Sequence, residues 1–218
     1  MSSSTVLIVD DEPLFGELLC RILSAEPGLD VIGVVRDGDA AVQLAKKTAP
    51  DVVLMDIELS GELDGIAAAT LIKQERPETG VVILSAHNDR RYVTSLPMEQ
   101  YPGWAYLLKQ TVPDIAALVR AIHGSIMGMV VLDPAVVMNL RPRQGSAVAR
   151  LTPRQREVLE LIAQGYNNAA IARQLTLAEK SVETYINAIY QEFRLSSEEG
   201  INVRVRATLL YLEDSRNR

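Results

Sequence analysis

The sequence predicts a doubly wound α/β domain of five parallel strands, followed by an all-helical domain. Through residue 126, short apolar runs rich in Val, Ile and Leu alternate with amphipathic helical stretches. This alternation is typical of parallel strands covered by helices on both faces. From residue 151 onward, helical patterns continue without a convincing strand. We therefore expect one domain at 1–126, a linker able to hold a short helix at 127–149, and a helical domain at 150–218.

The strands and helices of the first domain are expected to alternate along the chain. The expected strands are 5–10, 30–35, 51–56, 80–85 and 103–108. The expected helices are near 13–25, 38–48, 65–76, 89–99 and 112–126. Residues 87–102 fit this pattern least well, because Pro97 and Pro102 disfavour a regular helix and a tight turn.

Composition and charge indicate a folded, two-part protein. Hydrophobic residues make up 48% and charged residues 23% of the 218 residues. Residues 1–125 hold 18 acidic and 10 basic side chains, a net charge of −8, whereas residues 126–218 hold 10 and 12, a net charge of +2. This asymmetry suggests two parts with different partners.

The chain shows no sign of export or membrane insertion. No apolar run approaches the roughly 20 residues of a membrane span, and the first residues lack a signal-peptide pattern. The single cysteine, Cys20, lies in an amphipathic stretch and is interpreted as a buried structural thiol in a reducing compartment. His87 and His123 are too far apart in the sequence to suggest a zinc site. We therefore expect a cytoplasmic protein with no membrane partner.

The stretch STVLIVDDEP places three acids directly after an apolar run. Asp10, Asp11 and Glu12 are followed by Pro13. Asp11 or Glu12 could cap a helix whose first residue is Pro13. Alternatively, the carboxylates form a cation site, because clustered acids repel unless a positive charge joins them. The stretch alone leaves both interpretations open.

Reactive side chains also lie at the ends of three of the four other expected strands, where open α/β sheets bind their ligands. Asp56 ends the third strand, Ser85 the fourth and Lys109 the fifth. With Mg²⁺ bound, Asp56 would remain an ionised nucleophile able to form an aspartyl phosphate. Lys109 would neutralise charge on the phosphoryl oxygens, and the Ser85 hydroxyl would hydrogen-bond them. Each residue alone also has an ordinary explanation: a turn, a helix cap or a surface lysine.

Four segments together resemble the receiver domain of two-component response regulators. They are VDDEP, DVVLMDI, the Ser-Ala pair at 85–86 and AYLLK, and the resemblance covers about residues 4–125. It implies a CheY-like sheet of order 2-1-3-4-5, with Asp56 phosphorylated by a sensor histidine kinase. Residues 87–102 depart from the family pattern, which leaves the dimerisation face open.

The resemblance also assigns roles to the residues around Asp56. It implies that Mg²⁺ is held by Asp10, Asp11, Asp56 and the backbone carbonyl of Glu58. Asp11 is then the main magnesium carboxylate, and Asp10 contributes mostly through water. Ser85 takes a switch role, Lys109 senses charge, and Tyr106 matches the aromatic side chain that rotates on activation. Simple core packing is the alternative for Tyr106.

The last part of the chain begins with a strong helix-start signal. In LTPRQREVLELIAQG, Thr152 is expected to be the N-cap, Pro153 the first helical residue and Gln155 the partner in a capping box. Gly165 is expected to end this helix. Three more helical segments follow: NNAAIARQL, LAEKSVETYINAIYQEF and INVRVRATLLYLED.

The same segment resembles the LuxR-type helix-turn-helix of the NarL/FixJ response regulators over about 150–213. The recognition helix, expected at about 178–193, would lie in the major groove. Val182, Ile186, Ile189 and Phe193 form its apolar face. The expected DNA-binding residues share the opposite face and are Lys180, Ser181, Glu183, Thr184, Asn187 and Gln191. Lys180 and the hydroxyls suit phosphates, and Asn187 and Gln191 suit base edges.

These features favour a phosphorylation-controlled transcription regulator over an enzyme. We expect it to bind double-stranded DNA as a homodimer on activation, with RNA polymerase as a further candidate partner. In one alternative, the receiver is a phosphorylation-independent interaction module. In another, the chain is a phosphatase that uses Glu58 as a second carboxylate, although the attached helix-turn-helix counts against it.

Overall fold

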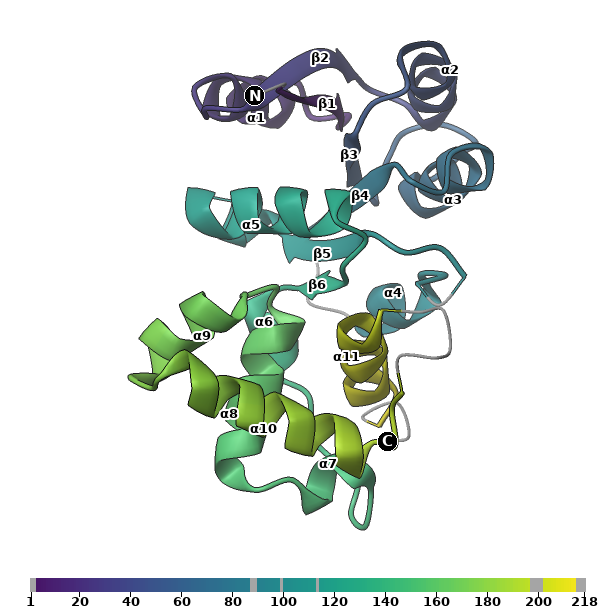
Figure 1. Ribbon diagram of the computed structural model, residues 1–218. Helices are drawn as coiled ribbons and strands as arrows, with labels where there is room; N and C mark the ends of the chain where they lie inside the picture. Colours follow the sequence, from purple (N-terminus) through teal and green to yellow (C-terminus); the bar gives the residue numbers. More distant parts are fainter. Residues whose placement is uncertain (1–2, 87–89, 99, 113, 197–201, 215–218) are drawn as a thin grey trace. The chain divides into compact units, whose positions relative to one another are not determined.

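The computed structural model describes residues 3–86, 90–98, 100–112, 114–196 and 202–214 (Figure 1). Its contacts divide the chain into two compact units, which we describe separately. The first comprises residues 1–88 and 96–128, and the second comprises residues 89–95 and 129–218. Within the described ranges, no helix is both long and apolar enough to cross a membrane.

The first unit is built on a parallel sheet. Its strands are β1 (Ser4–Val9), β2 (Leu29–Val35), β3 (Val52–Asp56), β4 (Gly80–Ser85) and β5 (Trp104–Leu108). The strands pair in parallel as β1–β2, β1–β3, β3–β4 and β4–β5. The order 2-1-3-4-5 expected from the sequence is confirmed. Both β3 and β4 are buried throughout, which explains their unbroken apolar sequences.

The strand number is a correction. A two-residue strand, β6 (Val131–Leu132), follows β5 in the sheet order and makes the sheet six-stranded rather than five-stranded. The sequence pattern missed β6 because two apolar residues show neither the length nor the periodicity that identifies a strand.

Four helices cover the two faces of this sheet (Figure 1). They are α1 (Pro13–Ser24), α2 (Gly38–Thr48), α3 (Gly65–Glu75) and α5 (Ile115–Ile126). The contacts of α1 are with β1 and β2 and those of α5 are with β3 to β5, while α2 packs beside α3. The expected doubly wound α/β architecture is therefore present, with its core between the sheet and these helices.

Aspartates start three of these helices. The side chain of Asp37 accepts a hydrogen bond from the backbone N–H of Ala40, and Asp64 does the same for Ala67. Asp114 caps α5 in the same way. Each cap satisfies one of the backbone donors that a helix start leaves free. The caps of α3 and α5 also fix two of the loops that leave the carboxyl edge of the sheet.

The helix expected at 89–99 is shorter in the structure. It is α4 (Arg90–Ser95), and residues 89 and 99 lie outside the described residues. Pro97 ends the regular pattern, since proline disfavours a helical conformation in the residue before it. The carbonyl of Pro97 instead accepts hydrogen bonds from the backbone N–H groups of Gln100 and Tyr101 at 3.1 and 3.0 Å. The expectation of a helix extending past Ser95 is therefore wrong.

The second unit is helical apart from β6. Its later helices are α6 (Pro134–Met138), α7 (Ala147–Arg150), α8 (Pro153–Ala163), α9 (Asn168–Leu175), α10 (Glu179–Glu192) and α11 (Val203–Asp214). Helix α6 lies where a short helix was expected, whereas α7 was not anticipated. Helix α8 has the expected start, with Thr152 and Gln155 forming both bonds of the capping box. The four helices expected after residue 150 correspond to α8 to α11.

Candidate functional site

Acidic side chains gather at the carboxyl edge of the sheet. Asp10 follows β1, Asp56 ends β3, and both are buried. Asp11 follows Asp10 and is half-buried. Each of the three residues offers a carboxylate oxygen, and these oxygens lie within 4.8 Å of one another. The parallel register of β1 and β3, with Val9 opposite Met55, produces this convergence.

Lys109 supplies the positive charge of this group. It immediately follows β5, and its Nζ lies 2.9 Å from Oδ2 of Asp56 and 3.0 Å from Oδ2 of Asp10. Burial alone would lower the pKa of Lys109. The hydrogen bonds and charges of Asp56 and Asp10 outweigh burial and raise that pKa above its ordinary value. Lys109 is therefore a permanent cation at this edge of the sheet.

The pKa values of the two buried carboxyls, Asp10 and Asp56, lie above the ordinary value for aspartate. Burial raises the pKa of Asp10 and of Asp56, and the neighbouring Lys109 offsets only part of that rise. The backbone N–H of Glu12 also donates to Oδ1 of Asp10 at 2.9 Å, and that of Glu58 donates to Oδ1 of Asp56 at 3.2 Å. Lys109 therefore does not fully offset the cost of burying the charged forms of Asp10 and Asp56.

The arrangement fits a divalent cation. Among the described groups, Oδ2 of Asp10 accepts no well-directed hydrogen bond, although Nζ of Lys109 is within ion-pair distance. This buried carboxylate oxygen is paired only with Lys109 among the described groups, and two further carboxylates lie beside it; such a hard oxygen set is the kind that Mg²⁺ or Ca²⁺ binds. The donor set therefore favours the cation-site interpretation for two of the three opening acids, Asp10 and Asp11.

The alternative interpretation, in which the side chain of Asp11 or Glu12 caps the first helix, is wrong. Glu12 is the N-cap of α1 and Pro13 its first residue, but no side-chain capping bond forms. Oε1 of Glu12 lies instead 3.2 Å from Nζ of Lys109. Oδ2 of Asp11 accepts hydrogen bonds from the hydroxyl of Ser60 at 2.5 Å and from its backbone N–H at 3.2 Å.

Ser60 and Phe15 belong to this site although the sequence reasoning did not select them. Ser60 lies four residues after Asp56 and holds the Asp11 carboxylate. The ring centroid of Phe15 lies 4.7 Å from Nζ of Lys109, a cation–π distance. A hydroxyl soon after the third strand and an aromatic residue in the first helical turn were the available signals. Neither is specific without the fold that brings them to Asp11 and Lys109.

Ser85 and Tyr106 lie where the strand pattern placed them. Ser85 is buried at the end of β4 and pairs in register with Leu108, the residue before Lys109. Tyr106 is fully buried within β5, opposite Ile83. The side chain of Glu58 is exposed. The switch roles of Ser85 and Tyr106 and the ligand role of the Glu58 carbonyl remain predictions.

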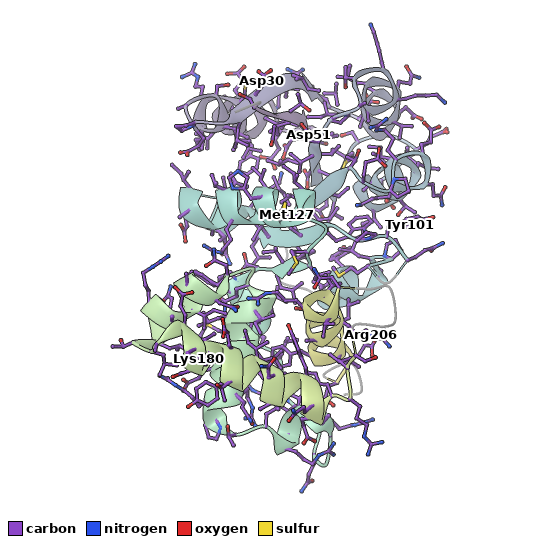
Figure 2. All side chains as sticks on the ribbon, in the orientation of Figure 1. Asp30, Asp51, Tyr101, Met127, Lys180 and Arg206 are labelled. Atoms are coloured by element: carbon purple, nitrogen blue, oxygen red, sulfur yellow. The ribbon has the colours of Figure 1, made fainter. Side chains whose placement is uncertain are left out.

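A second candidate site is the outer face of α10 in the helical unit. Val182, Ile186 and Ile189 are buried on its inner face, as expected. The residues expected to meet DNA lie outside this core. Five of them are exposed, namely Lys180, Glu183, Thr184, Asn187 and Gln191, and Ser181 is half-exposed. Lys180 lies in the first turn of α10 (Figure 2).

Helices α8 and α9 hold α10 in a helix-turn-helix arrangement. Both pack on α10, and the turn between α9 and α10 contains Thr176, whose backbone is left-handed. Arg204 of α11 donates to Oδ1 of Asn168 at 3.1 Å and to the carbonyl of Tyr166, so that it fixes the turn between α8 and α9. The sequence reasoning did not identify this role of Arg204.

The fold and these two sites define a class of protein. A doubly wound sheet with an acid and lysine pocket at its carboxyl edge precedes a helix-turn-helix with an exposed second helix. This combination is a signal-receiving domain joined to a nucleic-acid-binding domain. Comparison with family models agrees: residues 6–133 match the response regulator receiver domain, and residues 149–203 match the bacterial regulatory proteins of the luxR family. The chain belongs to the response regulators that join a receiver to a LuxR-type DNA-binding domain.

Curated relatives cover nearly the whole chain. The transcriptional regulatory protein DegU of Brevibacillus brevis is 32% identical over 212 residues, covering 88% of each chain. The nitrate/nitrite response regulator NarL of Escherichia coli K12 is 29% identical over 201 residues, covering 89% of this chain and 91% of NarL. The protein is therefore a DNA-binding transcription regulator and not an enzyme.

Solved structures share the fold. A LuxR-family response regulator from an Aurantimonas species is 27% identical with a TM-score of 0.55, covering 63% of this chain and 94% of that one. RcsB of Salmonella typhimurium has a TM-score of 0.57 at 24% identity, covering 98% of this chain and 99% of RcsB. This second likeness concerns the fold alone.

Proposed function

We propose that phosphorylation of Asp56 by a sensor histidine kinase controls DNA binding by this protein. The observation that carries the proposal is the pocket itself. Asp56 is buried beside Asp10 and Asp11, and Lys109 is 2.9 Å from its Oδ2. A carboxylate nucleophile with an adjacent cation and a metal-binding set has the parts that phosphoryl transfer needs.

The residues present fit Mg²⁺ as the resident cofactor. Asp10, Asp11, Asp56 and the backbone carbonyl of Glu58 would hold it. When bound, the ion supplies positive charge that keeps Asp56 ionised and offsets the charge of the phosphoryl oxygens. Ser60 would keep the carboxylate of Asp11 oriented, because it donates two hydrogen bonds to Oδ2.

In the transfer step, a carboxylate oxygen of Asp56 forms a bond to phosphorus. The bond between phosphorus and the imidazole nitrogen of the kinase phosphohistidine breaks, and that nitrogen keeps the electron pair. Lys109 neutralises the added charge on the phosphoryl oxygens. The hydroxyl of Ser85 then hydrogen-bonds a phosphoryl oxygen, and the side chain of Tyr106, which is already buried, rotates in response.

The proposed effect of phosphorylation is to bring two recognition helices together in a dimer. Phosphorylation would change how receivers pair, and a two-fold dimer would present two copies of α10 to adjacent half-sites. Lys180, Ser181 and Thr184 would contact phosphates, and Glu183, Asn187 and Gln191 would contact base edges. RNA polymerase is the further partner that we propose at the promoter, and binding to chromosomal DNA implies action in the cytoplasm.

The test combines intact mass with DNA binding. Incubation with Mg²⁺ and a small phosphodonor should add one phosphoryl group to the wild type and none to Asp56→Asn. The matched control is Asp30→Asn, which removes an exposed carboxylate on β2 (Figure 2) and should be phosphorylated like the wild type. Beryllofluoride with Mg²⁺ mimics a phosphoryl group on the aspartate. It should raise both the dimer fraction and the DNA affinity of the wild type. If Asp56→Asn binds DNA identically with and without beryllofluoride and so does the wild type, the protein is a phosphorylation-independent regulator.

A further inference from the structure

The third acid of the opening stretch has no part in the roles described so far. Glu12 does not cap α1 with its side chain, and it does not belong to the carboxylate cluster of Asp10, Asp11 and Asp56. Its Oε1 lies 3.2 Å from Nζ of Lys109. Its side chain is 68% exposed, whereas that of Lys109 is 13% exposed. Glu12 therefore reaches from the surface to the cation of the pocket.

Phe15 contacts the same ammonium group. Residues three apart on a helix lie on neighbouring parts of its surface, so that Glu12 at the start of α1 and Phe15 in its first turn face the same way. The ring centroid of Phe15 is 4.7 Å from Nζ of Lys109. A lysine ammonium is attracted to the face of an aromatic ring at this distance. Together Glu12 and Phe15 form what we call the α1 holder.

We propose that the α1 holder competes with the phosphoryl group for Lys109 and thereby sets how tightly the phosphorylated state is held. This inference rests on the proposed function, because it concerns the regulation of the same site. Glu12 and Phe15 are positioning residues: they act on the phosphoryl group through Lys109 and do not touch it.

The number of N–H donors on the Lys109 ammonium explains why Glu12 and a phosphoryl group compete for it. An ammonium group has three N–H donors. In the structure its neighbours are three carboxylates, those of Asp10, Asp56 and Glu12, at 3.0, 2.9 and 3.2 Å. A phosphoryl group on Asp56 brings new anionic acceptors, so that one of the present neighbours must give up its place.

Burial decides which neighbour leaves. Removing the ammonium from Asp10 would strand a buried carboxylate, which is costly. The exposed carboxylate of Glu12 can exchange Lys109 for water at little cost, because exposed ion pairs are weak. Glu12 therefore leaves first, and the strength of its contact opposes the binding of the phosphoryl group.

The main test measures beryllofluoride binding to the full chain with Mg²⁺ by calorimetry. Glu12→Gln keeps the size of the side chain and removes its charge. It should tighten beryllofluoride binding by about two- to five-fold, the range expected for an exposed ion pair. The difference should shrink at high salt, where exposed charges are screened. Glu12→Asp, which keeps the charge on a shorter side chain, should fall between the wild type and Glu12→Gln.

The matched control is Glu17→Gln. Glu17 is exposed on the same helix, carries the same charge, and is not among the described contacts of Lys109. It should leave beryllofluoride affinity unchanged. Equal tightening by Glu17→Gln would show that only net charge matters, and it would overturn the α1 holder. Unchanged or weaker binding by Glu12→Gln would do the same.

A second measurement needs no phosphoryl group. The ε-methylene protons of Lys109, assigned by comparison with Lys109→Arg, should carry a ring-current shift in the resting protein. Phe15→Leu should abolish that shift, and its persistence would contradict the ring contact.

A wild type that binds no beryllofluoride would refute the proposed function and the competition with it. Binding by the wild type with no gain in Glu12→Gln would refute the competition alone.

Discussion

Gly65, the first residue of α3, lies so close to Asp56 that an added Cβ would stand 1.7 Å from the carbonyl oxygen of Asp56. The backbone N–H of Gly65 also donates to the carbonyl of Ile57 at 3.1 Å. The start of α3 is therefore pressed against the end of β3. Only a residue without a side chain permits this approach, because the opposing atom belongs to the backbone and has little freedom to move.

Gly65→Ala should damage both stability and the site. The backbone of Asp56 or the start of α3 must move, and overpacking of this kind costs about 1–3 kcal/mol of unfolding free energy. Because Asp56 itself is displaced, phosphoryl uptake should also slow. Urea unfolding and intact-mass kinetics measure the two effects.

Gly16→Ala is the comparison for this prediction. Its added Cβ would meet a side-chain methyl of Val34 at 3.2 Å, which can shift. Gly16→Ala should therefore cost less stability than Gly65→Ala. A Gly65→Ala protein that is as stable and as readily phosphorylated as the wild type would show that the approach to Asp56 is not constrained.

Thr152→Ala should destabilise the helical unit without affecting phosphorylation. Thr152 accepts a hydrogen bond from the backbone N–H of Gln155, and the side chain of Gln155 accepts one from the backbone N–H of Thr152. Loss of such an N-cap typically costs about 1 kcal/mol. Thermal unfolding followed by circular dichroism measures the loss. Thr184→Ala, which removes only a hydroxyl bond to the carbonyl of Lys180 within α10, should cost less.

Arg204→Lys should be destabilising although it keeps the charge. The guanidinium of Arg204 donates to the side chain of Asn168 and to the carbonyl of Tyr166 at the same time. A lysine ammonium cannot reproduce this fork, so one of the two half-buried acceptors loses its charged donor, at a cost of about 1.5–3 kcal/mol. Arg173→Lys, on the exposed surface of α9, is the control and should be neutral. Equal stability of the two variants in urea would contradict this role of Arg204.

Glu183→Gln should raise affinity for DNA of any sequence. Glu183 is exposed on the outer face of α10, where its charge opposes the attraction of Lys180 for phosphates. Removing the charge should tighten binding of a random duplex by roughly two- to five-fold at low salt, with a smaller gain at high salt. Fluorescence anisotropy measures both. Unchanged affinity for random DNA would place Glu183 away from the phosphate backbone.

Local sequence signals predicted the parts of the fold that depend on local chemistry. Apolar runs gave the positions of β1 to β5, and the capping box at Thr152 and Gln155 started α8 as expected. The end of α4 and the strand β6 were not predicted. Pro97 made the end of α4 ambiguous. The strand β6 has only two residues, which are too few to show the periodicity of a strand.

The sequence predicted which residues form the candidate site, but it predicted only part of the contacts among them. Strand ends converge in this fold, so Asp10, Asp56 and Lys109 could be grouped from their positions. The bond between Lys109 and Glu12 joins residues 97 positions apart. Nothing in either segment distinguishes that contact from a helix cap, because the choice depends on the three-dimensional path between α1 and β5.

Lys73 of α3 is an amine enclosed in the first unit. It is fully buried, and its Nζ donates to the carbonyl of Pro77 at 3.0 Å and to that of Pro102. Burial lowers the pKa of Lys73 to about 8, with Glu78 opposing the shift. The stability of the protein should therefore depend on pH through this one side chain.

The direction of that dependence follows from proton counting. An unfolded lysine keeps its proton up to pH of about 10.4, whereas folded Lys73 loses it near pH 8. Between these values the unfolded chain binds more protons, so the free energy of unfolding rises with pH. Below pH 8 the burial cost is fully present and the contribution is flat. Relative to Lys73→Met, the wild type should gain about 2 kcal/mol between pH 8 and 10.

Urea unfolding of both proteins at pH 7, 8, 9 and 10 measures this gain. All other ionisable groups are the same in the two proteins, so their effects cancel when the two free energies are subtracted. Lys73→Met also leaves the carbonyls of Pro77 and Pro102 without their donor, but that loss is independent of pH. It shifts the whole difference curve and does not change its slope. A difference that stays flat from pH 8 to 10 would mean that the two carbonyls stabilise the ammonium enough to hold its proton in the folded core.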